Sequence, residues 1–103
     1  MREPGFLVLS ALVTEPRHGY ALMREIEHGS RGRVQLRTSS LYALLDKLAA
    51  DGLIEDAGRQ VVNGRLRRLF SLTDHGRELL TSEAARMVAQ AKEATRRLQI
   101  TST

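Results

Sequence analysis

Four arginines lie close together in a segment of this chain that contains no carboxylate. They are Arg59, Arg65, Arg67 and Arg68, and the acid-free segment runs from Ala57 to Leu72. The whole chain has 16 basic and 12 acidic residues, a formal charge of +4, and the window from Ser30 to Ser71 accounts for that entire surplus. Guanidinium groups bind phosphate oxygens strongly, so this concentration of charge is typical of a surface that binds nucleic acid.

Three hydroxyl residues, Thr38, Ser39 and Ser40, form a second chemically suggestive group. They precede leucines at positions 41, 44, 45 and 48, the spacing of one face of a helix. We expect the hydroxyls to cap this helix, which the pattern places from about residue 39 to residue 50. The first turn of such a helix can enter the DNA major groove, where hydroxyls bond to base edges or phosphates. Tyr42 either contacts DNA or packs at the junction with the following hairpin, and Tyr20 fits a core position as well as a DNA-facing one.

The other patterns predict the elements that position these groups. Two short helices, over about 6–13 and 18–28, are separated by Pro16, and Val34 and Leu36 alternate with polar residues as in a very short strand. A hairpin follows, with one strand starting near residue 53, a second over 66–72, and the turn signal Asn63-Gly64 between them. The order helix, helix, helix, hairpin, long helix predicts a mainly α (α+β) winged helix-turn-helix.

A long helix is predicted after Thr73, which should cap it, and runs to about residue 99. A helix of about 25 residues spans roughly 37 Å, longer than the body of so small a domain, so its far half must either meet another chain or stay in contact with water. Of these two outcomes we expect dimerisation. Residues 1–73 would then form the DNA-binding domain and 74–103 the dimerisation helix, within one compact unit. The apolar seam of this helix has heptad spacing and consists of Leu80, Ala84, Met87, Ala91, Ala94 and Leu98.

The composition narrows the classes of function. Without cysteine the chain can form neither disulfides nor thiolate metal sites. The longest apolar stretch, Phe6 to Leu9, is far shorter than a membrane span, and no secretory signal is recognisable, so we expect a cytoplasmic protein without membrane contact. No phosphate-binding loop, framed carboxylate pair or catalytic triad pattern is present, and the histidines lack metal-ligand spacing. We therefore expect no enzymatic activity, no cofactor and no metal site.

Three blocks of the sequence stand in a characteristic order. They are His18-Gly19-Tyr20 with Ile26, then Ser40-Leu41-Tyr42 with Gly52-Leu53-Ile54, and finally Asn63-Gly64-Arg65 with Gly76. These blocks resemble the PadR-type transcriptional regulators. The resemblance covers about residues 5 to 80 in the right order, and the single helix after it is similar to the short subfamily.

The resemblance implies a homodimeric DNA-binding repressor that dimerises through its last helix and takes a small-molecule effector in or near the dimer interface. Its dimer would bind a pseudo-palindromic operator in double-stranded DNA, with half-sites about one helical turn apart. The family's DNA contacts fall on Ser39, Ser40 and Tyr42 of the third helix and on Asn63, Gly64, Arg65 and Arg67 of the wing. To these we add Thr38, Arg59, Arg68 and Tyr20.

Two other interpretations stay open at this point. A winged domain can serve as a protein-interaction module without binding DNA, and neighbouring winged-helix families such as MarR or ArsR also regulate transcription. The chain departs from the common PadR pattern at Thr38-Ser39-Ser40 and Ala43, where prolines and a glycine are usual.

Overall fold

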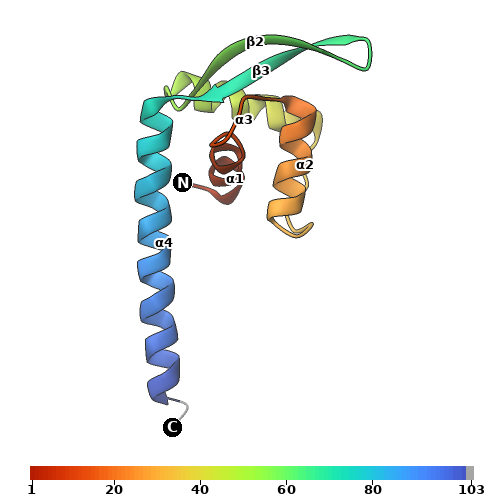
Figure 1. Ribbon diagram of the computed structural model, residues 1–103. Coiled ribbons are helices and arrows are strands. Elements are labelled where there is room, and N and C mark those ends of the chain that lie inside the picture. Colours follow the sequence, from red (N-terminus) through yellow and green to blue (C-terminus); the bar gives the residue numbers. More distant parts are fainter. Residues whose placement is uncertain (102–103) are drawn as a thin grey trace.

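The computed structural model describes residues 1–101, which form a small body from which the last helix projects (Figure 1). The sheet is antiparallel with strand order β1-β3-β2. This arrangement confirms the predicted α+β winged helix-turn-helix, with β2 and β3 as the wing. The elements are α1 (Glu3–Ala11), β1 (Arg17–His18), α2 (Gly19–Gly29), α3 (Thr38–Ala50), β2 (Ile54–Val62), β3 (Arg65–Leu72) and α4 (Asp74–Thr101).

The core lies between the first three helices and the base of the hairpin. The leucine stripe predicted for the third helix is confirmed, because Leu41, Leu45 and Leu48 are buried and Leu44 is half-buried against them. Full burial of one such side chain stabilises the fold by about 1.5–3 kcal/mol. This packing fixes α3 relative to the hairpin. The remaining buried apolar residues are Val8, Leu9, Leu12, Leu22, Ile26, Leu53, Ile54 and Phe70.

The short strands differ from the prediction. Residues 34–37 form no strand, because Val34 and Leu36 pack onto the core from an irregular segment. The Ser30 hydroxyl accepts a hydrogen bond from Val34 N–H at 2.9 Å and thereby holds this segment in place. The strand that the sequence did not predict is β1, which pairs with Phe70 and Leu69 of β3 and attaches the start of α2 to the wing.

The hairpin closes with the predicted two-residue turn. Asn63 and Gly64 have φ values of 52° and 77°, the left-handed pair that a type I′ turn requires. Strand β2 extends to Val62, so the wing is longer than the sequence indicated. A bulge between Asp56 and Arg59 shifts the register, and Gly58 within it has φ 97°.

Helix α4 begins at the predicted cap. The Thr73 hydroxyl accepts a hydrogen bond from Gly76 N–H at 2.9 Å and donates one to Gly52 O at 2.6 Å. Leu79 and Leu80 pack against the core, whereas the helix beyond them extends away from the body (Figure 1). None of the helices within residues 1–101 is long and apolar enough to cross a membrane.

Candidate nucleic-acid interface

The first turn of α3 presents hydroxyl groups to solvent. Thr38, Ser39 and Ser40 are all exposed, and their hydroxyls make no hydrogen bond within residues 1–101. The prediction that they cap the helix is wrong, because the extended backbone of Arg37 makes that residue the N-cap and its side chain forms no cap bond. The helix therefore starts with unsatisfied N–H groups beside three hydroxyls, a surface suited to phosphate oxygens or base edges.

Tyr42 connects three elements. Its hydroxyl oxygen lies 2.6 Å from the position that a Cβ atom on Gly19 would occupy, so any larger residue at the start of α2 would have to displace the Tyr42 side chain. Its ring meets Phe70 of β3 edge to face, with centroids 6.5 Å apart. Tyr42 is thus half-buried at the junction of α2, α3 and the wing. A contact between Tyr42 and DNA stays a prediction.

The strand register divides the four wing arginines between two faces. Arg59 lies opposite Arg68, on the face of the hairpin that also carries Phe70. Arg67 lies opposite Gln60, and Arg65 opposite a valine, so these two arginines belong to the other face. The wing therefore carries positive charge on both sides of a thin ribbon.

Arg68 is already engaged within the hairpin. Its guanidinium forms an ion pair with Asp56 at 3.4 Å and lies over the Phe70 ring at 5.0 Å. A hydrogen bond from Gly58 N–H to the Asp56 carboxylate, with the nearby charge of Arg68, lowers the pKa of that carboxyl below its usual value. Asp56 directly precedes the acid-free segment in the sequence, and the strand pairing brings its carboxylate back to the arginines of that segment.

The lowered pKa has a defined consequence for stability. A carboxyl whose pKa is lower in the folded state stabilises the fold above its unfolded pKa, here near 3.8, and this contribution is lost as the pH falls through the folded value. Asp56 is therefore ionised at neutral pH and offsets part of the charge of the wing.

The other wing arginines form no ion pair within residues 1–101, although the charge of Arg59 also helps to lower the pKa of Asp56. No ion pair is formed by Arg59, Arg65 or Arg67, and Arg67 Nε is buried without a hydrogen-bond partner. By contrast, Arg86, Arg96 and Arg97 on α4 each pair with a glutamate of the same helix. Three of the four wing arginines thus form no ion pair, in contrast to these three arginines of α4.

Sequence reasoning missed two basic residues of this surface. Arg37, the N-cap of α3, is exposed and forms no ion pair in the described part of the chain, and its place beside the hydroxyls could have identified it. Arg24 lies over the ring of Tyr20 at 5.8 Å. Tyr20 itself is 55% exposed, so it occupies a surface position at the start of α2 rather than a core one.

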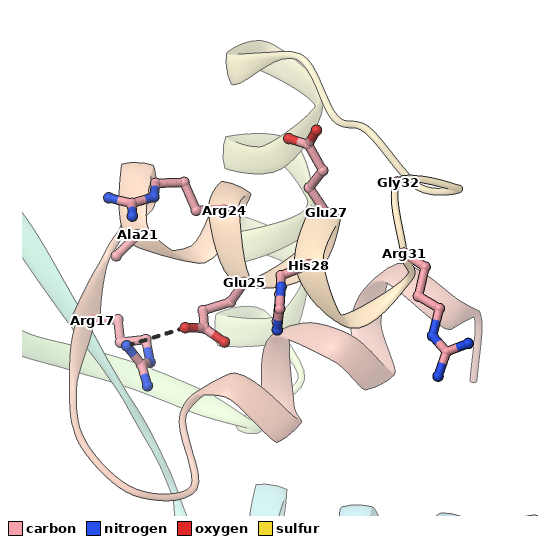
Figure 2. A pocket seen from close by; sticks show the side chains of 8 residues that line it. All are labelled: Arg17, Ala21, Arg24, Glu25, Glu27, His28, Arg31 and Gly32. Atoms are coloured by element: carbon pink, nitrogen blue, oxygen red, sulfur yellow. Dashed lines mark ion pairs between the residues drawn. The ribbon is translucent and has the colours of Figure 1, made fainter.

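A polar depression runs along the outer side of α2 (Figure 2). Arg17 forms an ion pair there with Glu25 at 3.7 Å, and Figure 2 shows the consecutive residues Glu27 and His28 near the end of the same helix. Because carboxylates alternate with the cations, this surface lacks the net charge of the wing. Within residues 1–101 no group of three potential metal ligands lies together.

Comparison with known proteins places the chain in a family. The model of the transcriptional regulator PadR-like family matches residues 8–82. A 37.1 kDa uncharacterized protein of a Streptomyces fradiae transposon is 45% identical over 84 residues, which are 79% of this chain and 22% of that protein. The chain thus spans about a fifth of the length of that relative.

Two solved structures share the fold. A PadR family transcription regulator from Clostridium difficile has a TM-score of 0.78 at 19% identity, covering 94% of this chain and 99% of its own. Bacillus subtilis PadR in complex with operator DNA has a TM-score of 0.69 at 20% identity, covering 81% of this chain and 48% of its own. With the family match over residues 8–82, these results identify the chain as a member of the PadR-like family of transcriptional regulators.

Proposed function

We propose that this protein is a homodimeric, sequence-specific DNA-binding repressor. The observation that carries the proposal is the combination of an uncapped, hydroxyl-rich first turn of α3 with a hairpin on which three arginines, Arg59, Arg65 and Arg67, form no ion pair within residues 1–101. The hairpin runs along α3 in Figure 1, and the Tyr42–Phe70 contact fixes their relation. A fold neighbour in complex with operator DNA supports the same use of this surface.

The two parts of the surface have different chemical roles in this proposal. The first turn of α3 enters the major groove, where Thr38, Ser39 and Ser40 bond to base edges and phosphates. The unpaired arginines of the wing bind phosphates along the flanking backbone and supply most of the affinity. Asn63 and Gly64 bring the backbone of the turn close to the DNA, and Tyr42 borders the contact.

Binding of genomic DNA fragments tests this function. We expect the purified protein to retard a small set of fragments in an electrophoretic mobility assay, and to do so at salt concentrations at which bulk competitor DNA no longer binds. A protein-interaction module would retard no fragment even at low salt. Absence of any shifted band would therefore overturn the proposal.

Neutralising Asp56 is expected to strengthen DNA binding. In Asp56→Asn the amide oxygen still accepts the hydrogen bond from Gly58, but Arg68 loses its ion-pair partner and becomes free to bind phosphate. The expected result is an affinity several-fold higher, with a salt slope steeper by about one. Fluorescence anisotropy at several salt concentrations measures both quantities.

The neighbouring acid provides the control for this variant. Glu55 is exposed and pairs across the strands with Ser71 rather than with an arginine. Glu55→Gln removes the same charge without releasing Arg68, so its salt slope should equal that of the wild type. An unchanged slope in Asp56→Asn would show that Arg68 does not reach phosphate.

Dimerisation through α4 belongs to the same proposal. Leu80 is already half-buried against the core, and Ala84 is half-buried at the point where the helix leaves the body. Beyond this point the seam residues Met87, Ala91 and Ala94 are exposed, and Met87 is 46% exposed. A second copy that packs on this seam would bury it. The two copies of α3, the helix proposed to read the DNA (the reading helix), would then stand at a fixed spacing. Leu98 continues the seam toward the end of the helix.

Charges in the seam are expected to separate the dimer. The double variant Met87→Glu with Ala91→Glu places two carboxylates per chain where the two helices would meet. The free energy needed to bury these charges exceeds the free energy gained when the two helices pack together. We expect a monomer in analytical ultracentrifugation at micromolar concentration. The matched control, Ala85→Glu with Ala89→Glu, adds the same charge to the opposite face of α4 and should remain dimeric. If both variants were monomers, or both were dimers, the proposed role of the seam in dimerisation would be contradicted.

Repression and its release by an effector complete the proposal. A groove of about 870 Å³ lies between α1, α3 and α4, and its walls include Ser40, Leu44 and Leu79. A small apolar molecule in this groove would contact the reading helix and the base of α4 together. Such a ligand would change the spacing of the two reading helices in a dimer, and the mismatch with the operator would weaken binding.

A further inference from the structure

The tip of the β2–β3 hairpin carries an apolar pair in an exposed position. Val61 and Leu66 are 68% and 63% exposed and lie directly opposite each other on the two strands. The two-residue turn makes Val62 and Arg65 the first hydrogen-bonded pair. Val61 and Leu66 therefore form the next, non-hydrogen-bonded pair, in which side chains approach most closely. Together they form one apolar ridge on one face of the ribbon.

Positive charge surrounds this ridge. Arg59 follows it on the same face of the hairpin, and Arg65 and Arg67 lie on the opposite face. None of these three arginines forms an ion pair within residues 1–101. An apolar strip between cations is complementary to a narrow apolar channel between two rows of anions. The minor groove of DNA has this form, with deoxyribose walls between two phosphate backbones.

We propose that Val61 and Leu66 enter the minor groove of the bound DNA and pack against its sugar walls, while the neighbouring arginines bind the phosphates. This inference rests on the proposed function and adds to it an interaction that reads shape. Guanine carries an amino group on the floor of the minor groove and A·T pairs do not, so the ridge should favour A·T-rich steps beneath the wing.

Replacing the ridge with threonine tests this interaction. Val61→Thr with Leu66→Thr keeps the strand propensity of both positions and removes the apolar surface without changing charge. On a DNA fragment that the wild type binds, we expect the affinity of the threonine variant to be lower by about tenfold, because two apolar side chains no longer pack against the sugars. The salt slope should stay the same, since every side chain that binds phosphate is still present.

Two further variants separate this interaction from a purely structural role. Val62→Thr makes the same change one residue away on the opposite face, and it should bind as the wild type does. Val61→Ile with Leu66→Ile keeps the ridge apolar and should restore the affinity that the threonine variant loses. All variants are compared at equal folded fraction, established by circular dichroism.

Base analogues beneath the wing give the decisive readout. Inosine in place of guanine removes the minor-groove amino group and leaves the major-groove edge intact, so it should tighten binding of the wild type but not of the threonine variant. Wild-type affinity in the threonine variant, or an equal loss in Val62→Thr, would overturn this inference alone and leave the ridge to a protein partner. A wild-type protein that binds no fragment would overturn the proposed function together with it.

Discussion

Substitution of Gly76 by alanine is expected to destabilise the fold by about 3 kcal/mol, which lowers the midpoint of thermal unfolding by about 12 °C or more. Gly76 is buried in the first turn of α4, where a methyl group would collide with the carbonyl oxygen of Leu53 and lie 2.8 Å from Leu72 Cδ1. The Leu53 carbonyl oxygen belongs to the backbone and cannot rotate away as a side chain could. Relief requires α4 to move off the base of the wing, which also disturbs the cap formed by Thr73.

A second helical glycine supplies the control. A Cβ atom on Gly5 in α1 would meet Met1 Cγ at 3.7 Å and Leu48 Cδ2 at 3.8 Å, which are ordinary van der Waals distances. Gly5→Ala should therefore be neutral or stabilise the protein by up to about 1 kcal/mol through helix propensity. Unfolding of both variants is followed by circular dichroism at one protein concentration, because the proposed dimerisation would make the midpoint depend on concentration. Equal midpoints for the two variants would contradict the close approach of α4 to Leu53.

Removal of the three unpaired wing arginines is expected to abolish most of the DNA affinity. The triple variant Arg59→Ala, Arg65→Ala, Arg67→Ala should weaken binding on the order of a hundredfold or more at moderate salt. The slope of log K against log salt concentration should become shallower by about three, because in the proposed complex each of the three arginines would neutralise one phosphate. Since phosphate binding carries little sequence information, the affinities for specific and competitor DNA should fall by similar factors.

Lysine replacements provide the matched control for this variant. Arginine to lysine at the same three positions keeps the charge and loses the planar bidentate geometry, so the salt slope should be retained while affinity falls by a smaller factor. A triple alanine variant with an unchanged slope would show that these side chains do not bind phosphate. A changed sequence preference at unchanged slope would assign at least one of them to base edges or to the shape of the minor groove.

The parts of this fold with strong local patterns could be predicted from the sequence. The leucine stripe of α3 requires only helical spacing, and Asn63-Gly64 requires only the left-handed conformations of a two-residue turn. The Thr73 cap likewise depends on residues within three positions of it. Each of these features is local, and each was confirmed.

Features defined by distant partners could not be predicted. Strand β1 exists only because Arg17 and His18 pair with β3, and no alternation marks so short a segment. The ion pair between Asp56 and Arg68 depends on the register that the bulge at Gly58 creates. The alternation that resembled a strand at Val34 instead reflects two side chains packed on the core from an irregular segment.

The candidate site also contains parts that the sequence predicted and parts that it did not. The sequence identified the arginine-rich wing and the hydroxyls of α3, but it assigned the hydroxyls to capping, because the true N-cap is an arginine without a cap bond. It also grouped Arg68 with the other wing arginines, which the structure separates by pairing Arg68 with Asp56. The difference matters for function, because only an unpaired cation is ready to bind phosphate.

A hydroxyl-radical footprint of the purified protein on its preferred genomic fragment tests the central claim most directly. A dimer that reads DNA with two α3 helices and two wings should protect two equivalent segments, related by pseudo-palindromic symmetry and separated by about one helical turn. The seam variant with charges at Met87 and Ala91 should lose the paired pattern, while its opposite-face control keeps it. A single protected segment, or uniform protection without preference for any sequence, would contradict the account.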